Sequence, residues 1–365
     1  MKQVLAARTP GLSIAHAPAA GVKQRLEMFD AMRFLAGVGV IWFHSVESAQ
    51  LGPSGVLGRF SVAFFTIMGV VVLYEGVRKY PQRTLRDFAA RRFRRLYLPF
   101  LGWSAIIGAV LVLLHEAVPA IHPAVLHLEL FITGTAEPLW FIPFFILGNI
   151  LIFPLAQWMK DNPRRELTAA LLCGILALAL DWIPWNHPPL HGVPLLGRLL
   201  ELSWNRWSAL YWGVVVAVLY SRGLRNSRFA PLLAFAGLLL TAALCAYQWH
   251  TGVTAPLKVL GGIGLAFVAL APLRGSIISF LGGLAPYSFG IYLSHALWIL
   301  LARTLVSAAG LPVSPMRDLN VFLAALFASV ISLRLLARHP SLRWLAGIDT
   351  PAQPRTVTAA KPVAI

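Results

Sequence analysis

Two ionisable residues, Arg33 and His44, lie in the apolar segment FDAMRFLAGVGVIWFHSVES. They are about eleven residues or three helical turns apart, so on one helix both side chains lie on the same face, about 16 Å from each other. If this helix spans a membrane, Arg33 lies near one surface and His44 lies deep in the bilayer. Inserting an ionisable group at that depth costs about 2.5 kcal/mol or more, so such a group normally faces the protein interior and has a function. The pair therefore indicates an enzyme or a carrier rather than a passive anchor.

The composition is that of a membrane protein. Of the 365 residues, 58% are hydrophobic and only 12% are charged, whereas about a quarter of a soluble chain is charged. Apolar segments long enough to cross a bilayer recur along the chain. We predict an all-α fold with ten transmembrane helices, at about residues 30–49, 59–77, 97–115, 139–159, 167–183, 207–221, 230–248, 255–273, 282–302 and 319–337.

The distribution of the net charge of +17 predicts the orientation. With the N-terminus in the cytoplasm, the inside segments hold 25 basic residues and the outside loops hold 6. The positive-inside rule therefore places both termini in the cytoplasm. We divide the chain into a cytoplasmic N-terminal segment (1–29), a transmembrane domain (30–338) and a cytoplasmic tail (339–365), and we expect no cleaved signal peptide. Because the basic excess has this topological explanation, we expect no nucleic-acid partner.

Loop 78–96 has a second interpretation besides orientation. It holds 8 basic residues and a single acidic one, Asp87. One interpretation is a loop that leans on anionic lipid headgroups. The other is a cytoplasmic anion site formed by Arg91, Arg92 and Arg95, in which Arg92 and Arg95 share a helical face. Planar guanidinium groups bind phosphates through paired hydrogen bonds, so a phosphorylated cosubstrate such as an acyl-coenzyme A would fit.

Two of the ten histidines fall deep inside predicted spans. His44 and His295 each lie about 20 Å from the cytoplasmic end of their helix. A buried histidine tends to be neutral, which suits a general base, although it can also simply donate a hydrogen bond to a neighbouring helix. Glu47, one turn beyond His44, either orients the imidazole or belongs to the outer interface. The positions of Cys173 and Cys245 inside spans indicate neither disulfides nor a metal site.

Aromatic residues gather near the predicted outer surface. Five tryptophans flank an outside loop between residues 182 and 212, and Trp140 begins another apolar stretch. They form either an aromatic belt at the headgroup level or a platform on which a sugar stacks.

In this order, the motifs of the chain resemble the integral-membrane acyltransferase 3 family. The resemblance rests on Arg33 and His44 in the first span, the phenylalanine-rich VAFFTIMGVVV in the second, and Arg92, Arg95 and Pro99 in the basic segment. It continues with the Trp140–Phe141 step and the run from Ser288 through Tyr292 to His295. The second span has Met68–Gly69 where a serine–glycine step is common, which leaves the subgroup and the acceptor open.

The resemblance implies a bacterial inner-membrane O-acyltransferase that takes an acyl group, preferably acetyl, from cytoplasmic acyl-coenzyme A. The acceptor would be a sugar hydroxyl of a surface glycan or a lipid-linked sugar. In this interpretation His44 is the general base or the acyl relay, and Arg33 steers the thioester or balances the oxyanion. Arg91, Arg92 and Arg95 hold the coenzyme A phosphates, and Trp140 and Tyr292 contact substrate.

The implied enzyme needs no permanent cofactor and no metal. The alternatives are succinyl transfer to a periplasmic glucan and, in a different class, a polysaccharide or small-molecule transporter. A transporter would show matching halves with broken helices, which the sequence does not display.

Overall fold

The computed structural model describes residues 27–114, 126–182, 199, 203–224, 228–252 and 257–347. Every regular element in these ranges is helical, so the predicted all-α fold class is confirmed. The Trp-rich loop between residues 182 and 212 lies largely outside the described residues, as does the tail beyond residue 347.

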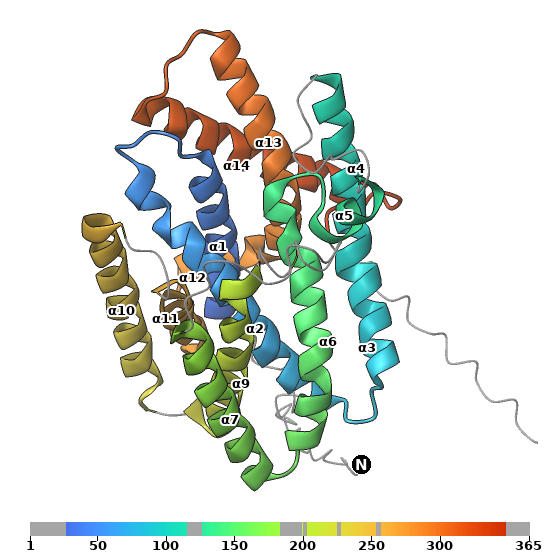
Figure 1. Cartoon of the computed structure of the whole chain (residues 1–365), viewed down its shortest axis with the longest axis vertical. Helices are drawn as coiled ribbons and strands as arrows, with labels where there is room; N and C mark the ends of the chain where they lie inside the picture. The colour runs from blue at the N-terminus through green and yellow to red at the C-terminus, as the bar shows by residue number, and fades with distance from the viewer. Residues whose placement is uncertain are drawn as a thin grey trace, which may run out of the picture.

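The described chain forms a bundle of long helices joined by short helical turns (Figure 1). The helices are α1 (Glu27–Ser45), α2 (Val56–Lys79), α3 (Leu85–Arg92), α4 (Leu98–Leu113), α5 (Leu126–Thr133), α6 (Phe141–Met159), α7 (Pro163–Trp182), α9 (Trp207–Ser221), α10 (Ala230–Thr251), α11 (Leu257–Leu270), α12 (Ser276–Leu284), α13 (Ser288–Ala308) and α14 (Pro315–Arg338). The short turns are η1 (Gly52–Gly55), the π-helical η2 (Phe93–Tyr97), η3 (Glu137–Trp140), η4 (Trp204–Arg206) and η6 (Ala285–Tyr287).

Each of the ten predicted segments coincides with a helix. Six helical stretches of the described chain are long and apolar enough to cross a membrane, and α9 and α11 are shorter apolar helices. The other two helices, α1 and α7, include charged side chains, such as Asp30 and Arg33 in α1 and Glu166 and Asp181 in α7. The chain is therefore a multi-pass membrane protein by its helices, and the count of ten stays a prediction.

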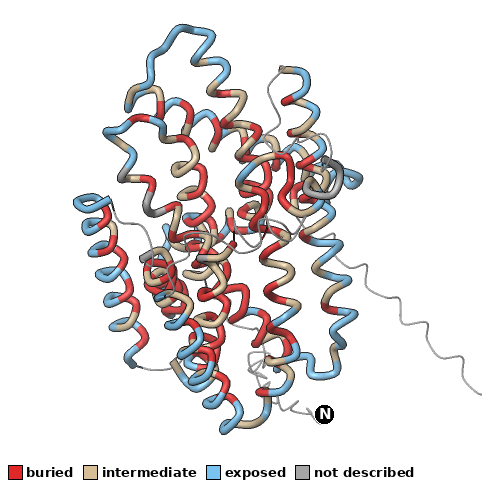
Figure 2. The backbone as a smooth tube through the Cα atoms, viewed as in Figure 1, coloured by how far each residue is buried: buried red, intermediate tan, exposed pale blue. Residues whose placement is uncertain are grey.

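Helix α2 lies at the centre of the bundle, packed against α1, α6, α9 and α11. Of its membrane-length segment 67% is buried, against 28% for α10 and 22% for α14. Figure 2 shows the same division, with buried residues through the middle and exposed ones along the outer helices. Since apolar side chains face outward on α10 and α14, these two helices present the surface expected to meet lipid.

Small residues bring neighbouring helices of the bundle close together. A Cβ atom on Gly58 of α2 would lie 2.2 Å from the backbone oxygen of Gly39 in α1. A Cβ atom on Gly237 of α10 would likewise lie 2.5 Å from the backbone oxygen of Gly264 in α11. Apolar burial gives helices little reason to associate within lipid, so such close backbone packing is a main source of attraction.

A polar cluster ties three helices together at one end of the bundle. The Tyr74 hydroxyl of α2 donates a 2.5 Å hydrogen bond to the Glu166 carboxylate of α7. The Arg222 guanidinium, just after α9, donates to the second oxygen of the same carboxylate at 3.0 Å. The buried Glu166 charge is thus paired, as a charge inside a bundle requires.

Candidate functional site

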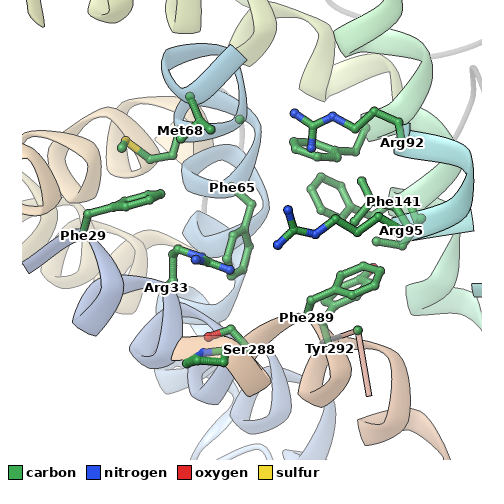
Figure 3. A pocket seen from close by; sticks show the side chains of 17 residues that line it. Phe29, Arg33, Phe65, Met68, Arg92, Arg95, Phe141, Ser288, Phe289 and Tyr292 are labelled. Carbon is green, nitrogen blue, oxygen red and sulfur yellow. The ribbon is translucent and has the colours of Figure 1, made fainter. Parts of the chain in front are cut away.

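One cavity of about 370 Å³ opens between α1, α2, α6, α13 and the basic segment α3–η2. Its volume is in the range of small-molecule sites. Its lining is mainly aromatic and aliphatic with three arginines (Figure 3). The residues are Phe29, Arg33, Phe65, Met68, Gly69, Val72, Arg92, Arg95, Leu96, Phe141, Ile142, Phe145, Pro286, Ser288, Phe289, Tyr292 and Gly347.

Arg33, Arg92 and Arg95 direct their guanidinium groups into this cavity from opposite sides (Figure 3). Arg33 comes from α1, where it pairs at 3.4 Å with the buried Asp30 carboxylate one turn earlier. The Arg92 guanidinium lies 5.1 Å from the ring centre of Phe88 and 5.6 Å from that of Phe145. These ring faces hold its guanidinium plane by cation–π attraction.

A π-helical turn lies within the basic segment. Residues 85–113 form one helical stretch, within which the segment η2 (Phe93–Tyr97) is π-helical. Such turns add a residue to the helical repeat and are frequent at functional sites. Arg92 precedes this turn and Arg95 lies within it, and both reach the cavity. Arg91 is exposed, donates to the Asp87 carbonyl of its own helix at 3.3 Å, and does not line the cavity.

Tyr292 connects the cavity to the histidines. It lines the cavity from α13, and its hydroxyl donates to the Pro138 carbonyl just before α6. Its ring centre lies 5.6 Å from that of His295, which lies in turn 5.4 Å from that of His44. Neither histidine lines the cavity. His44 and His295, which the sequence predicts at similar depths, are therefore direct neighbours in the fold.

The tautomer of His295 follows from its hydrogen bond. Its side chain is fully buried, and Nδ1 lies 2.5 Å from the Tyr292 carbonyl oxygen. A carbonyl only accepts, so Nδ1 carries the proton and Nε2 carries the lone pair. Within the described chain Nε2 is buried and has no hydrogen-bond partner. It is therefore a proton acceptor that the protein itself does not satisfy.

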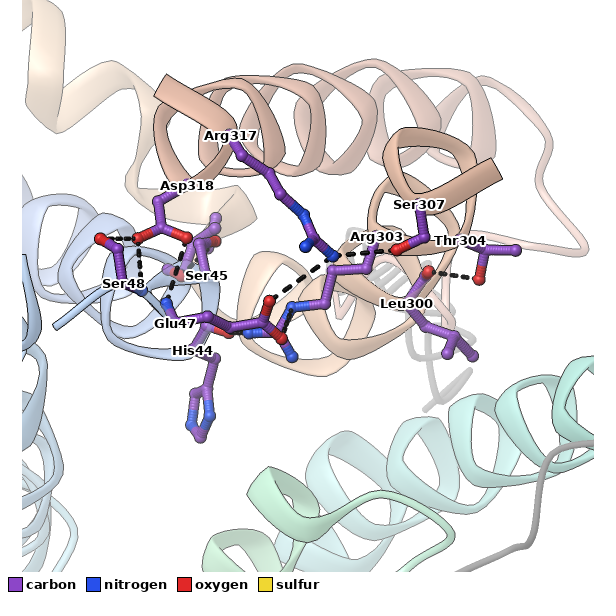
Figure 4. A network of polar contacts seen from close by, with 11 residues as sticks. His44, Ser45, Glu47, Ser48, Leu300, Arg303, Thr304, Ser307, Arg317 and Asp318 are labelled. Atoms are coloured by element: carbon purple, nitrogen blue, oxygen red, sulfur yellow. Dashed lines mark hydrogen bonds and ion pairs between the residues drawn. The ribbon is translucent and has the colours of Figure 1, made fainter. Parts of the chain in front are cut away.

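The end of α1 is fixed by a polar network that the sequence did not reveal (Figure 4). Arg303 donates a 2.7 Å hydrogen bond to the His44 carbonyl and pairs with the Glu47 carboxylate at 3.0 Å. Arg317 pairs with the other oxygen of Glu47 at 3.6 Å. The His44 imidazole points away from these charges. Of the two interpretations left open for Glu47, its pairing with two arginines argues against orientation of the imidazole.

The buried Asp318 completes this network. It accepts hydrogen bonds from the backbone N–H groups of Glu47 and Ser48, at 3.1 and 2.9 Å, and from the Ser48 hydroxyl at 2.5 Å. It belongs to α14, more than 270 residues from α1 in the sequence. Asp318 therefore holds the turn that follows His44.

Trp140, expected to contact substrate, is buried against the rings of Phe141 and Phe144 and does not line the cavity. Phe141, the next residue, does line it. Arg33, Arg92, Arg95 and Tyr292 are the predicted residues that the cavity brings together.

The comparison with protein families bears directly on this arrangement. A family model described as an acyltransferase domain matches residues 27–335. The chain belongs to the acyltransferase 3 family. It is therefore an acyltransferase that moves groups other than aminoacyl groups, and its apolar helices make it a multi-pass membrane enzyme. No curated protein and no solved structure matches the chain.

The Asp318 network gives a first prediction. Asp318→Ala leaves the N–H groups of Glu47 and Ser48 without their acceptor. Of the two, the Ser48 N–H is buried, and an unsatisfied buried donor costs about 1–3 kcal/mol. We expect a lower unfolding temperature and a loss of acyl transfer, because the turn after His44 is freed. Glu75→Ala is the control, since Glu75 forms only an exposed pair with Arg78 and such pairs contribute about 1 kcal/mol or less. Thermal unfolding in detergent and a transfer assay check both, and an Asp318→Ala protein with unchanged stability would contradict the role assigned here.

Proposed function

We propose that this enzyme is an O-acyltransferase, preferably an O-acetyltransferase, that uses acyl-coenzyme A as donor and a glycan hydroxyl as acceptor. The observation that carries the proposal is the position of three arginines in one aromatic-lined cavity, linked through Tyr292 to a pair of histidines. A charged end and an uncharged end in one site suit a donor that has phosphates at one end and a thioester at the other.

The cavity residues fit the chemistry of such a donor. Guanidinium groups of Arg33, Arg92 and Arg95 bind phosphate oxygens through paired, charge-assisted hydrogen bonds. The apolar rings around them suit the uncharged arm and the acyl group. Because Arg33 lies with the other arginines and not with His44, the structure favours its role in steering the donor over balancing an oxyanion beside His44.

The histidine pair supplies the acid–base chemistry of the proposal. His44 takes the proton from the acceptor hydroxyl as the oxygen attacks the thioester carbonyl. The tetrahedral intermediate then collapses, the carbon–sulfur bond breaks, and the imidazolium returns its proton to the leaving thiolate. The ester and free coenzyme A are the products. Such base catalysis is typically worth about 10²–10⁴-fold, and the Nε2 lone pair of His295 beside His44 is placed to share that proton.

The surroundings complete the proposal. We place the enzyme in a bacterial inner membrane with ten spans, both termini in the cytoplasm, and the basic segment facing cytoplasmic acyl-coenzyme A. The acceptor is a surface glycan or a lipid-linked sugar; succinyl transfer to a periplasmic glucan is the alternative in the same class.

The orientation can be tested with single cysteines in a protein in which Cys173 and Cys245 are replaced by serine. Gln82 lies between α2 and α3, and Val313 lies between α13 and α14; both are exposed. Because the 25-to-6 charge bias orients the chain, Val313→Cys should react with an impermeant maleimide in intact cells and Gln82→Cys only after lysis. The reverse pattern would refute the orientation.

The donor site has a matched control within the same basic segment. Arg92→Ala and Arg95→Ala should each weaken acetyl-coenzyme A binding about tenfold or more, because a phosphate loses a charge-assisted contact. Arg91→Ala removes an arginine outside the cavity and should leave the affinity within about twofold. Calorimetry on the purified proteins measures all three. Equal affinities for the Arg91, Arg92 and Arg95 variants would return the segment to a lipid-facing role.

His44→Ala should fold normally and bind donor normally, because the imidazole lies outside the cavity. Acyl transfer should fall by about two orders of magnitude or more, the lower end of what general base catalysis contributes. The exposed His250 at the end of α10 is the control: His250→Ala should keep full activity. Purified protein, labelled acetyl-coenzyme A and an acceptor glycan give the rates. Full activity of a well-folded His44→Ala protein would eliminate this mechanism.

A further inference from the structure

The chain continues beyond the matched acyltransferase domain, which ends at residue 335, into a compact series of turns at residues 339–347. We name these residues the C-terminal strap. Successive backbone hydrogen bonds close it, among them Leu345 N–H to the Leu342 carbonyl at 3.0 Å and Gly347 N–H to the Trp344 carbonyl at 3.1 Å. The sequence predicted only a cytoplasmic tail here.

The strap is packed into the bundle rather than lying on its surface. Leu345 is 7% exposed and Ala346 is fully buried. The Trp103 indole of α4 donates a 2.9 Å hydrogen bond to the Leu345 carbonyl. On α13, a Cβ atom on Gly290 would lie 2.7 Å from the Ala346 carbonyl oxygen, so the absence of a side chain there admits the strap. In Figure 1 the red end of the described chain lies beside α4 accordingly.

The last residue of the strap reaches the cavity. Gly347 is one of the lining residues. Its φ of +70° is in the left-handed region that favours glycine. A Cβ atom at this position would lie 2.5 Å from Cδ1 of Phe289, which also lines the cavity. Gly347 of the strap thus packs closely against Phe289 in the wall of the cavity.

We propose that the C-terminal strap forms a wall of the donor cavity and sets how tightly the donor is held. The strap joins α4 to α13 through its contacts with Trp103 and Phe289. Since α4 follows the arginine-bearing segment α3–η2 and α13 carries Tyr292, the strap sets the separation between the arginines and Tyr292. The donor role rests on the function proposed above; the packing of the strap against the cavity does not. A change at Gly347 therefore alters donor binding without touching any arginine or histidine.

Gly347→Ala tests this with a matched control elsewhere in the chain. Gly310, between α13 and α14, has nearly the same φ of +71°, but a Cβ atom there would have nothing within 4 Å. Both alanines therefore strain the backbone alike, and only the one at position 347 collides with Phe289. A second variant, Trp103→Phe, removes the hydrogen-bond donor to the Leu345 carbonyl while leaving the cavity lining intact.

Two readouts on full-length protein decide the outcome. Hydrogen exchange of residues 285–295 and 339–347 should rise in Gly347→Ala and Trp103→Phe and stay at the wild-type rate in Gly310→Ala. Acetyl-coenzyme A affinity should fall about tenfold in Gly347→Ala and remain within about twofold in Gly310→Ala.

Raised exchange with unchanged affinity would overturn the proposal, since the strap would then only stabilise the bundle. Exchange at 285–295 that does not respond to Gly347→Ala would overturn it as well. A wild-type protein that binds no acetyl-coenzyme A would instead refute the proposed function and, with it, the donor role of the strap, and raised exchange at 285–295 would then show only that the strap packs against α13.

Discussion

The spacing of the site residues depends on helix α1, which carries both Arg33 and His44. An α-helix rises about 1.5 Å per residue, so the spacing of eleven positions from Arg33 to His44 fixes their Cα atoms about 16 Å apart. Arg33 thereby belongs to the cavity and His44 to the histidine pair. Asp30 holds the first end through Arg33, and Asp318 and Arg303 hold the turn after the second. A donor with its phosphates at one end and its reacting group at the other must match this length.

The membrane explains why these polar groups are held so completely. Within an apolar bundle each charge needs a partner, because solvent is not there to stabilise it. Glu166, Glu47 and Asp318 each accept two or more contacts. The buried Nε2 of His295 departs from this pattern among the described histidines. Other buried polar atoms of the described chain, such as Ser104 Oγ and Asn149 Oδ1, also have no partner, so the role proposed for His295 rests on its position beside His44 and Tyr292.

The sequence predicted the helices well and the site in part. Apolar length and charge bias identify helices because the bilayer imposes both, and each predicted segment coincides with a helix. The depth of His44 and His295 in the bilayer stays a prediction from the same pattern. By contrast, the π turn that contains Arg95 has no sequence signal, and the sequence did not separate Arg91 from Arg92 and Arg95, although only the latter two line the cavity. Spacing left open whether Glu47 orients His44 or belongs to the outer interface, whereas its partners, Arg303 and Arg317, come from α13 and α14. The contacts of Asp318 with the turn after α1, and of the strap with α4, join segments far apart in the sequence. Periodicity along one helix cannot reveal such contacts.

The central claim is that the donor binds in the cavity with its phosphates at the arginines and its thioester end directed past Tyr292 toward the histidine pair. The most direct measurement is a cryo-electron microscopy structure of the full-length enzyme with acetyl-coenzyme A bound. The account predicts phosphates against Arg33, Arg92 and Arg95, with the thioester end directed past Tyr292 toward His295 and His44. Density for the nucleotide outside this cavity, or a thioester end directed away from the histidines, would contradict it.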